Sequence, residues 1–294
     1  MEVLAGVTSN TIEIKNSDAG DYNKVNYPFI ANQNFTNVDE QYIKGESLSV
    51  NERPSNSNWD LKGIVTTDGN NIELKFNKLQ FDIKEPGDRN SYSNQIIRAE
   101  RNGETITMTG DKLILNVIQQ NYNGTNSATE KSFSTSIYSK SSSGVILNVE
   151  KTTINVASNI KENLDSSGMT ADNGGNIEVN GDLNITVDTG KQGYGILTNK
   201  SGKVILNGDN NIKVAGGAET PYMAGIRSDD MDNTKGTSFI FNGNSTEINT
   251  ILNDAKDYSF VNGILSEKDI QFNNHDVLTI NTNLNTSNYS KNIG

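Results

Sequence analysis

One short pattern recurs seven times along this chain of 294 residues, and it restricts the fold more than any other feature. Each copy has a small residue followed by an apolar one, usually Gly-Ile, then a loop, an apolar-x-apolar triplet, a tight Asn/Gly turn and a second such triplet. The clearest copy contains Gly195-Ile196, Val204-Ile205-Leu206, Asn207-Gly208 and Ile212-Lys213-Val214. Self-similarity with a period near thirty residues indicates a repeat architecture.

The apolar residue that opens each copy recurs every 27 to 40 residues. The triplets keep nearly constant spacing, whereas extra residues fall mainly before the first triplet or after the second. A stacked solenoid requires this combination, because each coil must match its neighbour along the strands while loops can lengthen outward. The seven opening residues are Ile64, Ile97, Ile137, Met169, Ile196, Ile226 and Ile264, with Ile30 as a weaker earlier candidate.

Within each copy the apolar residues alternate with polar ones, which is typical of strands. An Asn-Gly pair between two such runs first suggests a hairpin, but a stack of hairpins would leave the Gly-Ile segment without a place. We therefore predict an all-β chain folded as a right-handed parallel β-helix with irregular loop insertions. The asparagines at the turns are expected to stack from coil to coil. An antiparallel sandwich or sheet stack is the alternative.

Two segments are expected. Residues 1–58 have weaker periodicity and are interpreted as degenerate first coils or a cap region, and Trp59 is expected to pack at the start of the first strong copy. Residues 59–294 hold the repeats, and we expect this array to be cut short at its C-terminal end. In the copy that opens at Ile226, the second triplet arrives one residue late at Ile248, which predicts a bulge.

Composition excludes several classes of function. The formal net charge is −11 and no basic stripe stands out, so nucleic acid is not expected as a partner. The sequence has no apolar run of transmembrane length, and its first residues do not resemble a signal peptide. It contains no cysteine, which excludes thiolate metal sites and would suit a chain that crosses the periplasm unfolded.

The repeats resemble the passenger domains of type V autotransporters. The closest matches are residues 193–214 and 175–187, and the resemblance extends over roughly residues 60 to 285. The Asn-, Lys- and Ile-rich composition is similar to the large outer-membrane autotransporter adhesins of fusobacteria. The membrane barrel that ends such proteins is not part of this sequence.

This resemblance implies a surface-displayed bacterial adhesin stalk, exported across the outer membrane and associated with virulence. The segment itself would be non-catalytic and not membrane-embedded, with an outer-membrane barrel anchoring the full-length protein. Loops on the stalk would contact a protein or glycan on a host cell or a neighbouring bacterium. The expected location is the cell surface or the extracellular space.

Aromatic residues in the longer loops are the first candidates for such binding. If these loops leave the coils on the same side, they would form a polar, tyrosine-bearing surface suited to sugars or a protein partner. The alternative interpretation is that the rings fold back and cover strand edges. The candidate residues are Tyr92, Tyr122, Tyr222 and Tyr258.

An enzyme is the competing hypothesis, in the form of a β-helical polysaccharide lyase or hydrolase. The best acidic cluster is Asp229, Asp230 and Asp232 with Arg227 beside it, and it could also hold calcium, although it lacks the spacing of an EF-hand. The single histidine, His275, lies in a turn, and no nucleophile elbow occurs, so a serine triad is not expected. No cofactor motif is present. A trimeric phage fibre is a third class, but no trimer seam is visible in the sequence.

Overall fold

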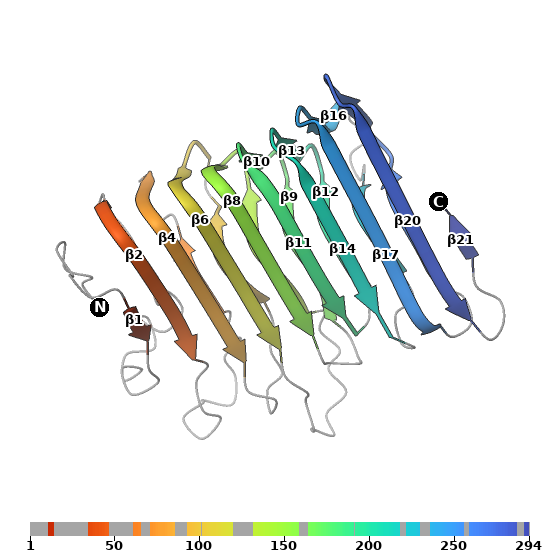
Figure 1. Cartoon of the computed structure of the whole chain (residues 1–294), viewed down its shortest axis with the longest axis horizontal. Coiled ribbons are helices and arrows are strands. Elements are labelled where there is room, and N and C mark those ends of the chain that lie inside the picture. The colour runs from red at the N-terminus through yellow and green to blue at the C-terminus, as the bar shows by residue number, and fades with distance from the viewer. Residues whose placement is uncertain are drawn as a thin grey trace.

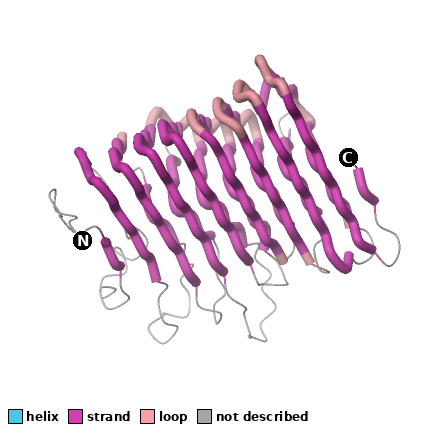
Figure 2. The backbone as a smooth tube through the Cα atoms, in the orientation of Figure 1, coloured by secondary structure: helices cyan, strands magenta, loops and turns pink. Residues whose placement is uncertain are grey.

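The computed structural model describes residues 11–14, 35–46, 61–65, 71–85, 93–100, 102–119, 132–158, 164–190, 192–217, 222–229, 236–255, 259–286 and 291–293. Every regular element within these ranges is a β-strand (Figure 2). Three of the four predicted binding tyrosines, Tyr92, Tyr122 and Tyr258, lie outside the described residues. The same is true of Ile30, Trp59, Asp230 and Asp232.

The strands follow one another in the order drawn in Figure 1. Their bounds are β1 (Thr11–Ile14), β2 (Phe35–Glu46), β3 (Leu61–Val65), β4 (Ile72–Glu85), β5 (Ser93–Ala99), β6 (Thr105–Gln119), β7 (Ser132–Lys140), β8 (Gly144–Ser158), β9 (Leu164–Asp172), β10 (Asn176–Val179), β11 (Asp182–Thr189), β12 (Gln192–Asn199), β13 (Lys203–Leu206), β14 (Asn210–Gly216), β15 (Tyr222–Asp229), β16 (Thr237–Phe241), β17 (Ser245–Ala255), β18 (Phe260–Ser266), β19 (Asp269–Phe272), β20 (Val277–Thr286) and β21 (Lys291–Ile293).

Every pair of neighbouring strands runs parallel. Each strand pairs with its equivalent in the next copy of the repeat, and the copies stack into one column (Figure 1). The fold is a parallel β-helix, which confirms the prediction and excludes the antiparallel sandwich. Parallel pairing of this kind needs a long connection between paired strands, which the rest of each coil supplies.

The seven opening residues form one continuous row along the eight-stranded sheet, which contains β3, β5, β7, β9, β12, β15, β18 and β21. Each is paired in register with the next, from Ile64 in β3 to Ile264 in β18. All of them except Ile264 are fully buried. The spacing of 27 to 40 residues therefore changes only the loops and leaves the register of the sheet unchanged.

The two triplets of each copy belong to a thirteen-stranded sheet that forks. In the earlier coils one long strand, such as β6 or β8, spans both triplets. After β8 the sheet divides into the series β10, β13, β16, β19 and the series β11, β14, β17, β20, so the later coils have three strands each. The prediction of three strands per copy is correct for these later coils. In the earlier coils the backbone continues through the turn as a strand.

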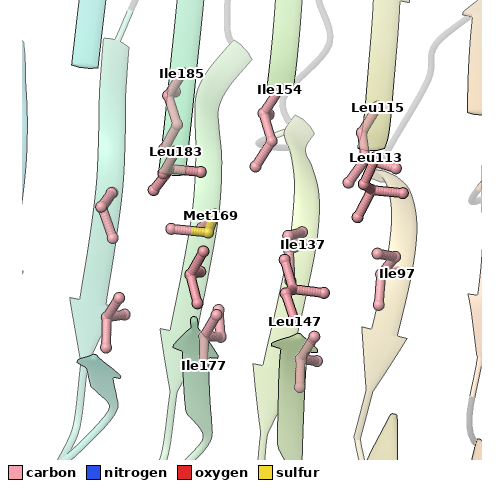
Figure 3. Close-up of a cluster of buried hydrophobic side chains, with 14 of the residues drawn as sticks. Ile97, Leu113, Leu115, Ile137, Leu147, Ile154, Met169, Ile177, Leu183 and Ile185 are labelled. Carbon is pink, nitrogen blue, oxygen red and sulfur yellow. The ribbon is translucent and has the colours of Figure 1, made fainter. Parts of the chain in front are cut away.

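The core is a stack of apolar rows inside the coils (Figure 3). Ile177 and Val204 are paired in the first-triplet row, and Ile185 and Ile212 in the second-triplet row, and all four side chains are buried. Because most inward positions stack on a chemically similar one, a modest apolar content of 33% is enough to fill this narrow interior.

The turn between the triplets carries a ladder of asparagine side chains, as predicted. Asn180 Nδ2 donates to Asn148 Oδ1 over 2.6 Å, Asn207 donates to Asn180, Asn242 donates to Asn207 over 2.6 Å, and Asn273 donates to Asn242 over 2.9 Å. The extra residue of the copy that opens at Ile226 lies in this turn. The bulge predicted at the second triplet is wrong, because β17 pairs with β14 without a shift. The register shifts in this copy lie elsewhere, between Thr237 and Phe239 in β16 and between Leu252 and Ala255 in β17.

The last described coil is less covered than the others. Phe272 and Leu278 are 39% and 41% exposed, whereas their paired residues Phe241 and Thr246 in the preceding coil are buried. β21 pairs in parallel with β18 and covers part of this end.

At the other end, β1 pairs with β2 and β2 pairs with β4. Segments of residues 1–58 therefore also join the thirteen-stranded sheet.

Candidate functional site

The outer face of the eight-stranded sheet gathers the most varied polar and aromatic side chains among the described residues. Tyr194, Leu197 and Ala224 form a cluster separate from the core, so they lie on the side of the sheet that faces away from the row of Ile196. In each copy, the residue before the glycine of the Gly-Ile pair and the second residue after this glycine therefore point outward together. In β12 these two residues are Tyr194 and Leu197. Two outer rows result: Gln95, Thr135, Ser167, Tyr194, Ala224 and Asn262, and Arg98, Tyr138, Thr170, Leu197, Arg227 and Leu265.

Arg227 on β15 is the centre of the first polar cluster on this face. Its guanidinium lies over the ring of Tyr194 on β12, 5.1 Å from the ring centroid, and Nη1 donates to the Tyr194 hydroxyl over 2.7 Å. Nε donates to Asp229 Oδ1 over 2.7 Å, and the Tyr194 hydroxyl donates to Gln192 over 2.8 Å. The aromatic face and the carboxylate hold the guanidinium in one orientation.

Partial burial alone would lower the pKa of Arg227, because it disfavours the charged form. The hydrogen bonds and charge interactions with Asp229 and Tyr194 outweigh this effect, and the pKa of Arg227 is raised above its usual value. The arginine is therefore a permanent cation at this position, compensated by one carboxylate.

Arg98 on β5 is the centre of a second cluster with the same residue types. It lies over the ring of Tyr138 on β7 at 5.6 Å from the centroid. Nε and Nη2 donate to the two carboxylate oxygens of Glu100 over 2.9 and 2.5 Å, and Nη1 donates to Gln95 over 2.8 Å. All three guanidinium nitrogens of Arg98 thus have an acceptor within its own strand segment.

Tyr138 also belongs to this second cluster and reaches the next coil. Its hydroxyl donates to Asp172 Oδ2 over 3.1 Å. Burial, followed by the charge of Asp172 and this hydrogen bond, raises the pKa of Tyr138, so the phenol stays neutral well above neutral pH. The coil between the two clusters has short outward side chains, Ser167 and Thr170, whose hydroxyls are bonded to each other at 2.7 Å.

Tyr222 is the one predicted binding aromatic that lies among the described residues. It is 43% exposed, and its ring stacks on Phe260 of the paired strand, with centroids 5.2 Å apart and planes inclined by 4°. Both rings stand on the outer face of the sheet, one coil apart. One face of the tyrosine is therefore covered by its neighbour, and the exposed part is the rest of the ring with the hydroxyl.

Only two residues of the predicted acidic cluster at positions 227–232 lie among the described residues. Arg227 and Asp229 are brought together as an ion pair, while the other two aspartates lie outside the described ranges. The single histidine, His275, has its Nδ1 atom 2.5 Å from the carbonyl oxygen of Gly243, and its ring packs against Phe272. These contacts give His275 a packing role at the last coil.

Within the described ranges, no three carboxylate or imidazole side chains gather closely enough to hold a metal ion. No helix in the same ranges has the length and apolar character needed to cross a membrane.

The sequence interpretation missed Tyr194, Arg98, Tyr138 and Asp172. These residues lie in strands that the repeat itself identifies, so aligning the copies on their opening isoleucines and reading the outward positions would have found them.

Comparison with known proteins gave no match to any protein-family model, any curated protein sequence or any solved structure.

Proposed function

We propose that this chain is a non-catalytic segment of a surface-displayed bacterial autotransporter passenger, acting as an adhesin stalk. In this proposal the column holds a binding surface away from the cell that displays it. The partner is a protein or glycan on a host cell or a neighbouring bacterium.

The observation that carries the proposal is the unbroken parallel register of the eight-stranded sheet from β3 to β18. Such a column is stiff along its axis, and it keeps side chains of successive coils at a fixed spacing of about 4.8 Å. Loops vary in length without disturbing this spacing. A scaffold of this kind can present several weak contacts at once, which add through multivalency.

The repeat also suits export through a narrow pore. Each coil contacts mainly its neighbours, so folding can start at one end and propagate as the chain emerges. The absence of cysteine removes the risk of disulfide formation while the chain is unfolded in an oxidising compartment. These properties support the resemblance to autotransporter passengers noted in the sequence.

The outer face of the eight-stranded sheet is the surface we assign to binding. It combines the exposed Tyr222 with the Arg227 cluster, and tyrosine and arginine are the residue types that contribute most to recognition surfaces. The alternative of a polysaccharide-cleaving enzyme would use Asp229 and Arg227, but these two side chains are bonded to each other.

The experiment is to display the chain between a secretion signal and an outer-membrane barrel on a non-adherent bacterium. Protease accessibility of the displayed chain and binding to epithelial cells and to other bacteria are measured. The proposal expects display and cell binding above that of the same barrel without the chain. Efficient display with no binding to any cell would reduce the chain to a spacer, and release of sugar fragments from polysaccharides would support an enzyme instead.

A further inference from the structure

The Arg227 cluster differs from the Arg98 cluster in one chemical respect. Within the part of the chain that the structure describes, Nη2 of Arg227 and Oδ2 of Asp229 have no hydrogen-bond partner, whereas all three nitrogens of Arg98 and both carboxylate oxygens of Glu100 are engaged. Arg227 and Asp229 are also accessible, with side-chain exposures of 25% and 18%. A fixed donor and a fixed acceptor are therefore presented side by side to solvent.

The surroundings add a further polar group and an apolar one. Asn199 of β12 is paired with Asp229 across the strands, is partly exposed and has no described side-chain partner. Leu265 of β18 is paired with Arg227 on the other side and is 40% exposed. The site thus has hydrogen-bonding groups at its centre and an apolar surface at its margin.

The charges and the backbone restrict what this site can bind. The cation and the carboxylate compensate each other, so the pair offers little attraction to an anion and instead matches a neutral ligand with a donor and an acceptor. β12 and β15, which carry Asn199, Arg227 and Asp229, are each paired on both sides, so these residues offer no strand edge to an extended peptide. β18 is paired with β21 only over Phe260–Asn262. Two neighbouring hydroxyl groups on a sugar ring supply both a donor and an acceptor, and the ring carbons supply an apolar face.

We propose that Arg227, Asp229 and Asn199 bind a vicinal pair of hydroxyl groups on a neutral glycan, with Leu265 contacting the ring carbons. This inference deepens the proposed adhesive function and rests on it. Tyr194 is a positioning residue in this site, because it holds the guanidinium by its ring and its hydroxyl and is itself almost completely buried.

The first experiment uses polyacrylamide conjugates of glucose, galactose, mannose and fucose, with binding to the immobilised full chain measured by biolayer interferometry. At least one neutral conjugate is expected to bind, and the same conjugate is expected to lose binding after mild periodate oxidation, which cleaves vicinal diols. Equal binding of the oxidised conjugate, or binding only of a sialic acid conjugate, would overturn the inference.

The variants are Arg227→Lys and Asp229→Asn, each of which keeps the size of the side chain. Each is expected to weaken binding by about tenfold or more, because a hydrogen bond to a charged group is lost or weakened. Arg98→Lys is the matched control, since it makes the same change in the cluster whose donors are already engaged, and it is expected to bind as the unchanged chain does. Circular dichroism and thermal unfolding confirm that all three variants are folded. Unchanged affinity in both site variants would overturn the inference.

A cell assay separates the two proposals. Beads coated with the chain are added to cells treated with periodate, with protease or with buffer. Loss of binding after periodate supports the glycan inference. Binding that survives periodate but is lost after protease overturns it and leaves the adhesive function intact. Absence of binding to untreated cells removes the adhesive function and the ligand inference together.

Discussion

Gly225 and Ile248 meet across the interior of the column: a Cβ atom placed on Gly225 would lie only 2.0 Å from Cγ2 of Ile248. The same relationship joins Gly195 to Ile212 in the coil before, at 2.2 Å. The glycine of the Gly-Ile pair is therefore required by packing, because any side chain there would occupy the space of the facing isoleucine.

Substitution Gly225→Ala is expected to destabilise the chain by about 1–3 kcal/mol, since a methyl group is forced into a filled core. Gly217→Ala is the control, because a Cβ at that position would meet nothing within 4 Å. Urea unfolding followed by circular dichroism measures both. Equal urea midpoints for Gly225→Ala and Gly217→Ala would contradict the prediction, because they would show that the core around Gly225 accommodates a methyl group at little cost.

The asparagine ladder predicts a difference between interior and terminal members. Asn207→Ala removes the bonds donated to Asn180 and Glu178 and the bond accepted from Asn242, whereas Asn273→Ala removes the one bond donated to Asn242. At about 1 kcal/mol for each bond, the interior substitution is expected to cost roughly two to three times as much. Thermal unfolding of the two variants checks this, and a larger loss for Asn273→Ala would contradict the ladder as a source of stability.

The second-triplet row predicts that the cost of a cavity depends on position in the column. Ile212 is fully buried, whereas Ile280 in the same row of the last described coil is only partly buried. Ile212→Ala is expected to cost about 2–5 kcal/mol and Ile280→Ala clearly less, because less apolar surface is re-exposed. Denaturant unfolding of the two single variants makes the comparison, and equal costs would argue against an open end at this coil.

A turn offers a route to higher stability. Lys200 and Ser201 have positive φ angles of 43° and 64°, and the equivalent turn of the preceding coil has Asn173 and Gly174 at 48° and 79°. The double substitution Lys200→Asn and Ser201→Gly is expected to stabilise the chain by roughly 1 kcal/mol, because asparagine and glycine adopt this conformation at lower cost. A raised unfolding temperature supports this, while the control Ser245→Gly, placed in a strand, is expected to lower it.

The raised pKa of Tyr138 predicts how the stability of the folded chain depends on pH in alkaline solution. Burial first, and then Asp172, raise the pKa of Tyr138 in the folded state above the value of about 10 in an unfolded chain. The corresponding stability is fully present below that unfolded value and is lost as the pH rises through the folded-state pKa. Tyr138→Phe is therefore expected to unfold with a weaker dependence on pH above about 10, whereas Tyr222→Phe, at an exposed ring, is the control. Ultraviolet titration combined with unfolding curves measures the effect, and identical pH profiles for Tyr138→Phe and the unchanged chain would contradict it.

The sequence contained the fold because its signals are local and repeated. Every opening residue is followed by two triplets at nearly constant spacing from each other. The register of Ile196 on Ile226 could therefore be predicted without any long-range information. The Asn207 ladder followed from the chemistry of the turn. The bulge near Ile248 was wrong because an additional residue in a turn costs less than a break in a paired strand.

The polar clusters were harder to predict because each joins residues from different coils. Arg227 contacts Tyr194 only because both copies are aligned on their glycines, and the lengths of the intervening loops conceal that alignment in the linear sequence. Attention to loop tyrosines therefore singled out Tyr222 but not the strand residues beside it. The expectation that Tyr222 lies in a loop is wrong, because Tyr222 is the first residue of β15. The outward positions of a repeat carry no periodic apolar signal, so their partners emerge only when the coils are superposed.

The hydrogen bonds between coils run along the axis of the column, and this has a mechanical consequence. A pulling force applied between the two ends acts along these bonds, so the chain would peel away one coil after another from an end instead of yielding everywhere at once. Each step would release about thirty residues, roughly 100 Å of extended chain. A tether built in this way lengthens under load and can re-form coil by coil when the tension falls.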